Sequence, residues 1–166
     1  MFNVVLIEPE IPNNTGNIGR TCVGLNSRLH LVGPLGFSID DKQVRRSGLD
    51  YWQNLDLEYY KSRDDWQKSM PSGARIHLIE TGSSRTIYDI EYRAGDYLVF
   101  GRETTGIPHE ILEKFSDHVY SIPFPGGIRS FNLSNCVAMV MSEGYRQLQC
   151  GNRQMREIGL NSTDAQ

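Results

Sequence analysis

Three stretches of the sequence combine glycine with side chains that can hold a polar substrate. They are EPEIPNNTGNIGR (8–20), GRETTGIPHE (101–110) and PFPGGIRSFNLSN (123–135). Their amides, hydroxyls and arginines form directional hydrogen bonds, and glycine lets the main chain approach a ligand closely. Each stretch alone is weak support for a site, because a glycine-rich loop is more often a plain turn. Asn13 and Asn14 could also simply cap a helix.

Other catalytic and metal-binding patterns are missing from the sequence. It has neither a GxxxxGK[ST] phosphate loop nor a GxGxxG dinucleotide motif, which argues against an ordinary nucleotide triphosphatase or nicotinamide dehydrogenase. The three cysteines are widely spaced without a CxxC pair, and the four histidines lack metal-ligand spacing. We therefore predict no disulfide framework and no metal site.

The elements that must position these stretches alternate between strand and helix. Short apolar runs predict strands at 3–7, 28–32, 57–60, 75–80, 97–101 and 119–124. Polar or periodic segments predict helices from about 13 to 26, at 40–49, 62–70 and 109–115, and from about 132 onward. The alternation predicts an α/β fold with a mostly parallel sheet flanked by helices. Since ligands bind at the carboxyl ends of parallel strands, we expect the three stretches to converge on one pocket.

Length and charge limit the function further. The 166 residues fit one domain, predicted to span 1–150, with a polar and poorly ordered tail over 151–166. The net charge of −3 gives no global basic field, so a nucleic-acid partner would need a local basic patch. The start MFNVVLIEPE is not a signal peptide, and no apolar run has the length of a membrane span. We therefore expect a cytoplasmic protein.

The same stretches resemble the motifs of the SPOUT superfamily of RNA methyltransferases. EPEIPNNTGNIGRTC is similar to the first motif, DYLVFGRETTGIP to the second and SIPFPGGIRSFNLSNCVA to the third. GPLGFSIDDKQVRRSGLDY resembles a stretch of the small single-domain subgroup that methylates the 2'-hydroxyl of the tRNA wobble nucleotide, cytidine or modified uridine at position 34. The resemblance implies S-adenosylmethionine as methyl donor without a metal, a C-terminal deep trefoil knot, a homodimer and the tRNA anticodon stem-loop as partner.

The resemblance also implies roles for individual residues. Arg20 would be catalytic, either as a base or, as we prefer, by positioning the hydroxyl, because arginine is normally fully protonated. Asn135 would assist it. A polar turn would place Arg20 at the mouth of the pocket, although taken alone this arginine could equally lie on a solvated helix face. The predicted donor-binding residues are Ile79, Gly101, Glu103, Ile122, Ser130 and Asn132. At Gly101 we expect a side chain to fill the space where the backbone meets adenine.

RNA binding is expected from local positive charge. The candidates are Lys42, Arg45, Arg46 and Arg129, which would contact phosphates without reading sequence. Tyr51 and Trp52 could stack on a flipped base, although core packing is the simpler interpretation. The last helix carries an apolar stripe with Val140, Met141 and Tyr145, part of which could face a partner helix.

Two other functions remain open from the sequence. One is a SPOUT methyltransferase for another tRNA or rRNA site, although sister families there usually carry an extra N-terminal RNA-binding domain. The other is a non-catalytic RNA-binding module with the same fold. The presence of Arg20, Glu103 and Asn135 together argues against such a module.

Overall fold

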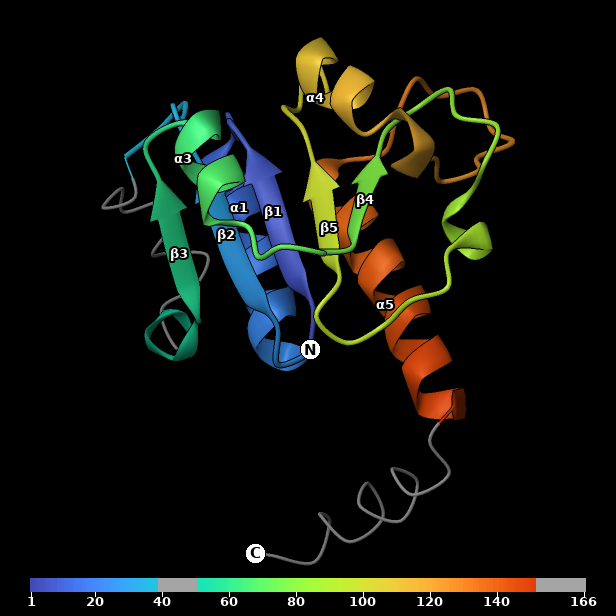
Figure 1. Ribbon diagram of the computed structural model, residues 1–166, viewed down its shortest axis with the longest axis horizontal. Coiled ribbons are helices and arrows are strands. Elements are labelled where there is room, and N and C mark those ends of the chain that lie inside the picture. The colour runs from blue at the N-terminus through green and yellow to red at the C-terminus, as the bar shows by residue number, and fades with distance from the viewer. Residues whose placement is uncertain (39–50, 152–166) are drawn as a thin grey trace, which may run out of the picture.

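The protein is built around one parallel sheet. The computed structural model describes residues 1–38 and 51–151. Its six strands follow the order β3-β2-β1-β5-β4-β6, and every neighbouring pair is parallel (Figure 1). The predicted α/β fold with a mostly parallel sheet is confirmed. The strands are β1 (Asn3–Ile7), β2 (Arg28–Val32), β3 (Leu57–Tyr60), β4 (Ile76–Ile79), β5 (Tyr97–Phe100) and β6 (Val119–Tyr120).

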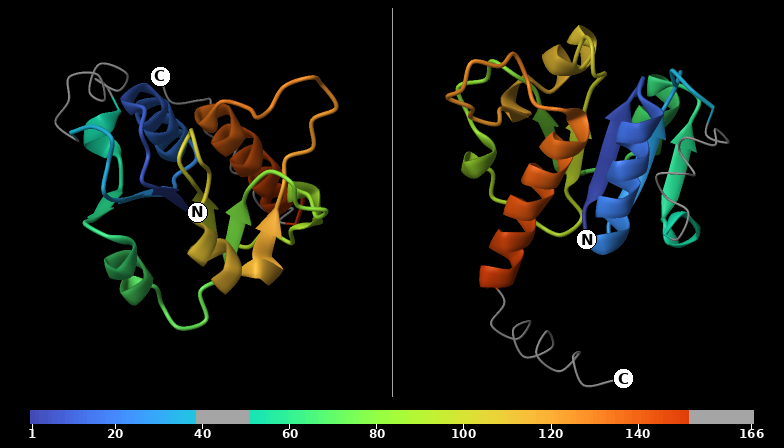
Figure 2. Two further views of the ribbon diagram at one scale, coloured as in Figure 1. Left: turned by 90° about the horizontal axis from the view of Figure 1, so that it is seen from above. Right: turned by 180° about the vertical axis from the view of Figure 1, so that it is seen from behind.

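Helices cover both faces of this sheet. The long helices α1 (Pro12–Gly24) and α5 (Leu133–Gly151) lie side by side on one face, and the short helices α3 (Arg63–Ser69) and α4 (His109–Lys114) lie on the other (Figure 2). Short 3₁₀ turns are η1 (Trp52–Asn54), η2 (Ile87–Asp89) and η3 (Ser116–His118). Within the described ranges, no helix is long and apolar enough to cross a membrane.

Strand β1 shows why the apolar runs are nearly continuous. Its alternate residues enter two different cores: Val4 and Leu6 pack under α1 and α5, whereas Val5 and Ile7 pack under α3 and α4. All four are fully buried. A central strand of a parallel sheet covered on both faces requires this pattern, because it has no solvent-facing side.

Helix α1 begins differently from the prediction. Pro12 occupies its first turn, where the missing N–H costs nothing, and Ile11 at the N-cap makes no side-chain capping bond. Asn13 and Asn14 therefore do not cap the helix, and Asn14 is buried. Most of the 8–20 stretch is consequently helix, so the expected polar turn around Arg20 is wrong.

Strand β6 is shorter than predicted. It ends at Tyr120, although Ile122 is still buried. Pro123 has no N–H to donate to a neighbouring strand, which favours the departure of the chain from the sheet here. By contrast, the prediction that Ser62 caps a helix is confirmed, since its Oγ accepts the Asp65 N–H at 3.2 Å.

The apolar stripe of α5 belongs mainly to the chain's own core. Val137, Val140 and Met141 are fully buried against the sheet and α1. Val140 and Met141 are therefore not the part of the stripe that could face a partner helix, whereas Tyr145 is only half-buried, and the partner helix stays a prediction. The trefoil knot implied by the resemblance stays a prediction. The predicted helix at 40–49 and nearly all of the predicted tail, 152–166, lie outside the described residues.

Candidate functional site

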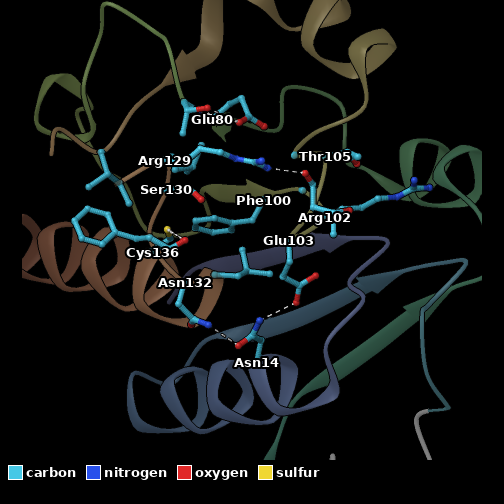
Figure 3. Close-up of a pocket in the computed structure, with 18 of the residues that line it drawn as sticks. Asn14, Glu80, Phe100, Arg102, Glu103, Thr105, Arg129, Ser130, Asn132 and Cys136 are labelled. Carbon is cyan, nitrogen blue, oxygen red and sulfur yellow. Dashed lines mark hydrogen bonds between the residues drawn. The ribbon is translucent and has the colours of Figure 1, made fainter. Parts of the chain in front are cut away.

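A cavity of about 440 Å³ opens at the carboxyl edge of the sheet (Figure 3). Strand order reverses between β1 and β5, and α/β proteins bind ligands at such switch points. The segments that follow β1, β4, β5 and β6 form the walls together with the start of α5. The predicted convergence of the three polar stretches on one pocket is therefore confirmed.

The cavity collects all six of the predicted donor-binding residues. Its lining includes Ile79, Gly101, Glu103, Ile122, Ser130 and Asn132, and also Arg129, which we expected to bind RNA. The two predicted catalytic residues, Arg20 and Asn135, are exposed and do not line it. Lys42, Arg45 and Arg46 lie outside the described residues.

The loop that follows β5 is folded tightly on itself. Arg102 and Gly106 exchange two backbone hydrogen bonds, each 3.0 Å long. A Cβ on Gly101 would lie 2.0 Å from the Gly106 carbonyl carbon and 2.1 Å from the Ile107 nitrogen. The expected reason for this glycine is thus corrected: its missing side chain makes room for the loop itself rather than for adenine.

Glu80 holds the far end of the same loop and was missed by sequence reasoning. Its Oε2 accepts the Ile107 N–H at 2.7 Å, and its Oε1 accepts the Thr81 N–H at 2.9 Å. Gly106 has a φ of +72°, and a Cβ there would lie 2.3 Å from the same Oε2. The available signal was an acidic residue placed directly after a buried strand, at the edge where ligands bind.

A chain of side-chain hydrogen bonds joins all three polar stretches. The Asn132 amide donates to Asn14 Oδ1 at 2.9 Å, and the Asn14 amide donates to Glu103 Oε1 at 2.9 Å (Figure 3). The Glu103 carboxylate also accepts the backbone N–H of Glu10 at 2.8 Å. We call Asn132, Asn14 and Glu103 the loop bridge. It explains why Asn14 is buried, and it gives Glu103 a role in organising the segments around the cavity.

Two arginines beside the cavity hold loops rather than projecting freely. Arg129 donates to the Thr104 carbonyl at 3.1 Å and so links the third stretch to the second. Arg102 extends away from the centre of the cavity (Figure 3). Its guanidinium pairs with Glu8. Glu8 is only 3% exposed and also binds Arg63 Nε at 3.1 Å. The positive charge of Arg102 is therefore paired with Glu8 on the side of the loop that faces away from the cavity.

Arg20 lies on α1 with its guanidinium carbon 5.0 Å from the centroid of the Tyr51 ring. Tyr51 is 7% exposed, which confirms that it packs rather than presenting a free stacking surface. The prediction that Arg20 stands at the mouth of the pocket is wrong for the cavity of its own chain, because a residue in the third turn of α1 faces a different direction from the loop bridge.

The chemistry of the cavity favours binding and positioning. Its walls combine the aromatic side chains Phe100, Phe124 and Phe131 with carboxylate, hydroxyl and amide groups, as expected for a ligand with a flat ring and polar ends. Burial raises the pKa of the Cys136 thiol in its wall to about 11, so this thiol is not an activated nucleophile. Over residues 1–38 and 51–151, no group of acidic, histidine or cysteine side chains could hold a metal ion.

Comparison with known proteins gives concordant matches. Residues 1–142 match the model of the SpoU rRNA Methylase family. The chain is 45% identical to the tRNA (cytidine(34)-2'-O)-methyltransferase of Saccharophagus degradans, over 89% of this chain and 96% of that protein. It superposes with a TM-score of 0.87 and 41% identity on a structure described as "Structural insights into the 2-OH methylation of C/U34 on tRNA", covering 90% of this chain and 97% of that one.

A more distant likeness concerns the fold. The SpoU methyltransferase AviRb from Streptomyces viridochromogenes, solved in complex with the cofactor AdoMet, superposes with a TM-score of 0.75 at 24% identity. The match covers 88% of this chain and 60% of that one.

Proposed function

The chain belongs to the SpoU rRNA Methylase family, and from that premise we propose that it transfers a methyl group from S-adenosylmethionine to the 2'-hydroxyl of the tRNA wobble nucleotide, cytidine or modified uridine at position 34. The observation that carries the proposal is the cavity, which the three polar stretches build together and which the loop bridge fixes in shape. The wobble position is supported by the name of the relative from Saccharophagus degradans.

The residues of the cavity fit the donor. Gly101 and Gly106 keep the loop closed, so that its backbone forms one wall, and Ile79 and Ile122 supply apolar surface for adenine. Ser130 and Asn132 offer a hydroxyl and an amide on the same wall for the polar parts of the donor. When bound, the donor supplies an electrophilic methyl group on a positively charged sulfur, so the transfer itself requires no metal.

The remaining task of the protein is to align a ribose hydroxyl and remove its proton. Positioning two reactants in one site can contribute a large part of a rate enhancement. We assign the acceptor side to Arg20, whose guanidinium would orient the hydroxyl and the adjoining phosphate. Asn135 would assist from the start of α5, where it is exposed.

The acceptor is an RNA nucleotide in a single-stranded loop. Only RNA presents a 2'-hydroxyl, and a loop nucleotide can be turned outward at a lower cost than a paired one. Lys42, Arg45, Arg46 and Arg129 would bind the phosphates of the anticodon stem-loop in the cytoplasm. This binding should weaken steeply with salt, as phosphate contacts do.

The working unit would be a homodimer. Arg20 does not line the cavity of its own chain, so a second copy could present its α1 to that cavity and complete the site. Ile11 and Met139, which are 44% and 38% exposed on the α1 and α5 side, provide apolar surface for such a contact. Light scattering at assay concentration should give the dimer mass, and a monomer that retains full activity would refute this part of the proposal.

The experiment separates donor binding from transfer. Calorimetry in a chelating buffer should detect binding of S-adenosylmethionine or of its demethylated product, and labelled methyl should then appear in tRNA. Arg20→Ala should keep the donor affinity and lose nearly all transfer. A well-folded protein that binds neither donor nor product would contradict the proposal. If Arg20→Ala lost donor affinity as well as transfer, Arg20 would belong to the donor side of the site rather than to the acceptor side.

A further inference from the structure

We propose that Tyr51 is a positioning residue that holds the guanidinium of Arg20 in the orientation needed for methyl transfer. The inference rests on the proposed function and deepens it, because it names the group that fixes the catalytic arginine. Three contacts between α1 and the segment 51–55 carry it.

The first contact is between the two side chains. The guanidinium carbon of Arg20 lies over the Tyr51 ring, 5.0 Å from its centroid. A cation at this distance from an aromatic face is attracted by the negative potential of the ring. An exposed arginine otherwise samples many rotamers, so a fixed ring beneath the guanidinium narrows the directions in which it can point.

The second contact fixes the ring itself. The Tyr51 hydroxyl donates a hydrogen bond to the Gly16 carbonyl oxygen at 2.5 Å. In an α-helix that oxygen also accepts the backbone N–H of the residue four positions later, which is Arg20. One carbonyl can serve both donors because it has two lone pairs. Tyr51 is thus tied to the same turn of α1 from which Arg20 projects.

The third contact is the close fit of the neighbouring residues. Gly19, directly before Arg20, is buried, and a Cβ there would lie 3.2 Å from Leu55 Cδ2 and 3.3 Å from Trp52 Cζ3. Segment 51–55 therefore packs flush against the backbone of α1. The Tyr51 hydroxyl contacts Gly16, the neighbouring residues pack on Gly19, and the Tyr51 ring contacts Arg20. These positions lie within about one turn of α1, so a shift of Tyr51 would release the Arg20 guanidinium.

The consequence concerns the rate of transfer rather than binding. A misplacement of about 1 Å in a catalytic group can lower a rate by about 100-fold. Tyr51→Leu, which removes the ring and the hydroxyl, should lower kcat by about 30- to 100-fold while leaving the donor Kd and the tRNA KM within about threefold. Tyr51→Phe keeps the ring and should retain kcat within about tenfold of the wild type.

A matched variant separates positioning from general stability. Tyr92 is also a buried tyrosine, 4% exposed, but its ring packs against Phe2 and His77 rather than against Arg20. Tyr92→Leu should lower the free energy of unfolding as Tyr51→Leu does, yet keep kcat. All variants are compared with the wild type below their unfolding transitions, by donor calorimetry and by steady-state methylation of tRNA.

The outcomes distinguish the two proposals. A wild type that transfers no methyl to tRNA defeats the proposed function itself. If the wild type is active, three results would each contradict the positioning role. In the first, folded Tyr51→Leu keeps the wild-type kcat, and in the second, Tyr92→Leu lowers kcat as much as Tyr51→Leu does. In the third, Tyr51→Phe lowers kcat as much as Tyr51→Leu does. A rise in tRNA KM with kcat unchanged would instead make Tyr51 a binding residue.

Discussion

Each of the two edges of the sheet holds an acidic side chain in hydrogen bonds, and they use it differently. At the amino edge, Asp96 is 1% exposed and accepts hydrogen bonds from His77 Nε2 at 3.0 Å and Arg75 Nε at 2.8 Å. Those partners lie 19 and 21 residues away in the sequence. At the carboxyl edge, Glu103 of the loop bridge binds Asn14 and the Glu10 N–H, which lie 89 and 93 residues away.

This difference separates a structural cluster from a site. The Asp96 cluster joins the starts of the adjacent strands β4 and β5. The loop bridge instead fixes the start of α1 and two loops relative to one another around a cavity, so a change in the bridge should change the shape of the cavity. Burial of a carboxylate is therefore a weak sign of function, whereas bonds to distant loops beside a cavity are a strong one. Substitutions at the two edges should separate donor affinity from stability.

The largest effect is expected from Gly101→Ala. The added Cβ would stand 2.0 Å from the Gly106 carbonyl carbon, so the loop must open and the cavity must change shape. Donor affinity should fall by about 1,000-fold, or about 4 kcal/mol. Calorimetry measures it, with Gly126→Ala as control because a Cβ there meets nothing within 4 Å. Equal affinities in the two variants would show that the loop does not shape the donor site.

The next effect is on stability at the opposite edge. Asp96→Ala leaves the buried His77 and the Arg75 guanidinium without their carboxylate, and should lower the free energy of unfolding by about 3 kcal/mol. Donor affinity should not change, since the cluster lies away from the cavity. Urea denaturation and donor calorimetry give the two values. Weak donor binding by a fully folded Asp96→Ala protein would break the distinction between the edges.

A third effect appears when the pH is lowered. Burial lowers the pKa of His30 on β2 to about 4, and this side chain is stacked on Tyr60. Between its unfolded pKa of about 6.5 and pH 4, His30 binds a proton in the unfolded chain but not in the folded chain. The free energy of unfolding therefore decreases by about 2 to 3 kcal/mol as the pH is lowered through this range. Urea midpoints across this range measure the slope. His30→Asn should remove it, and a slope that persists in the variant would assign it to other groups.

The smallest effect is expected within the loop bridge. Asn14→Ala removes both central hydrogen bonds but leaves Glu103 bonded to the Glu10 N–H. Donor affinity should fall by about tenfold, or about 1.4 kcal/mol, because the loops keep their internal bonds and lose only their mutual alignment. Calorimetry tests this, with Asn13→Ala as control because Asn13 is exposed on the same helix. A larger loss in Asn13→Ala than in Asn14→Ala would contradict the bridge.

Much of this arrangement was predictable from the sequence. Short apolar runs located the six strands, and the polar stretches after β1, β5 and β6 located the cavity, because periodicity and strand ends are local properties. The beginning of α1 was misread because asparagine favours both helix caps and buried hydrogen bonds. Only the fold shows that Asn14 meets Glu103 and Asn132 from distant stretches.

The remaining differences are also matters of tertiary packing. The sequence predicts Glu80 as the last residue of a strand, whereas its contact with the Ile107 N–H depends on how the distant loop folds back. Gly101 was correctly placed in the cavity, but the reason for its lack of a side chain depends on how a five-residue turn closes, which spacing does not reveal. The position of Arg20 over Tyr51 joins residues of two separate segments, and no local pattern predicts such a contact.

The central claim is tested most directly by locating the methyl group. Wild-type protein is incubated with S-adenosylmethionine and tRNA, and the digested product is analysed by mass spectrometry, with tRNA carrying a 2'-deoxynucleotide at position 34 as control. We expect one new ribose methyl at the first anticodon nucleotide and none on the deoxy control. A methyl group on a base, or on a ribose outside the anticodon loop, would contradict it.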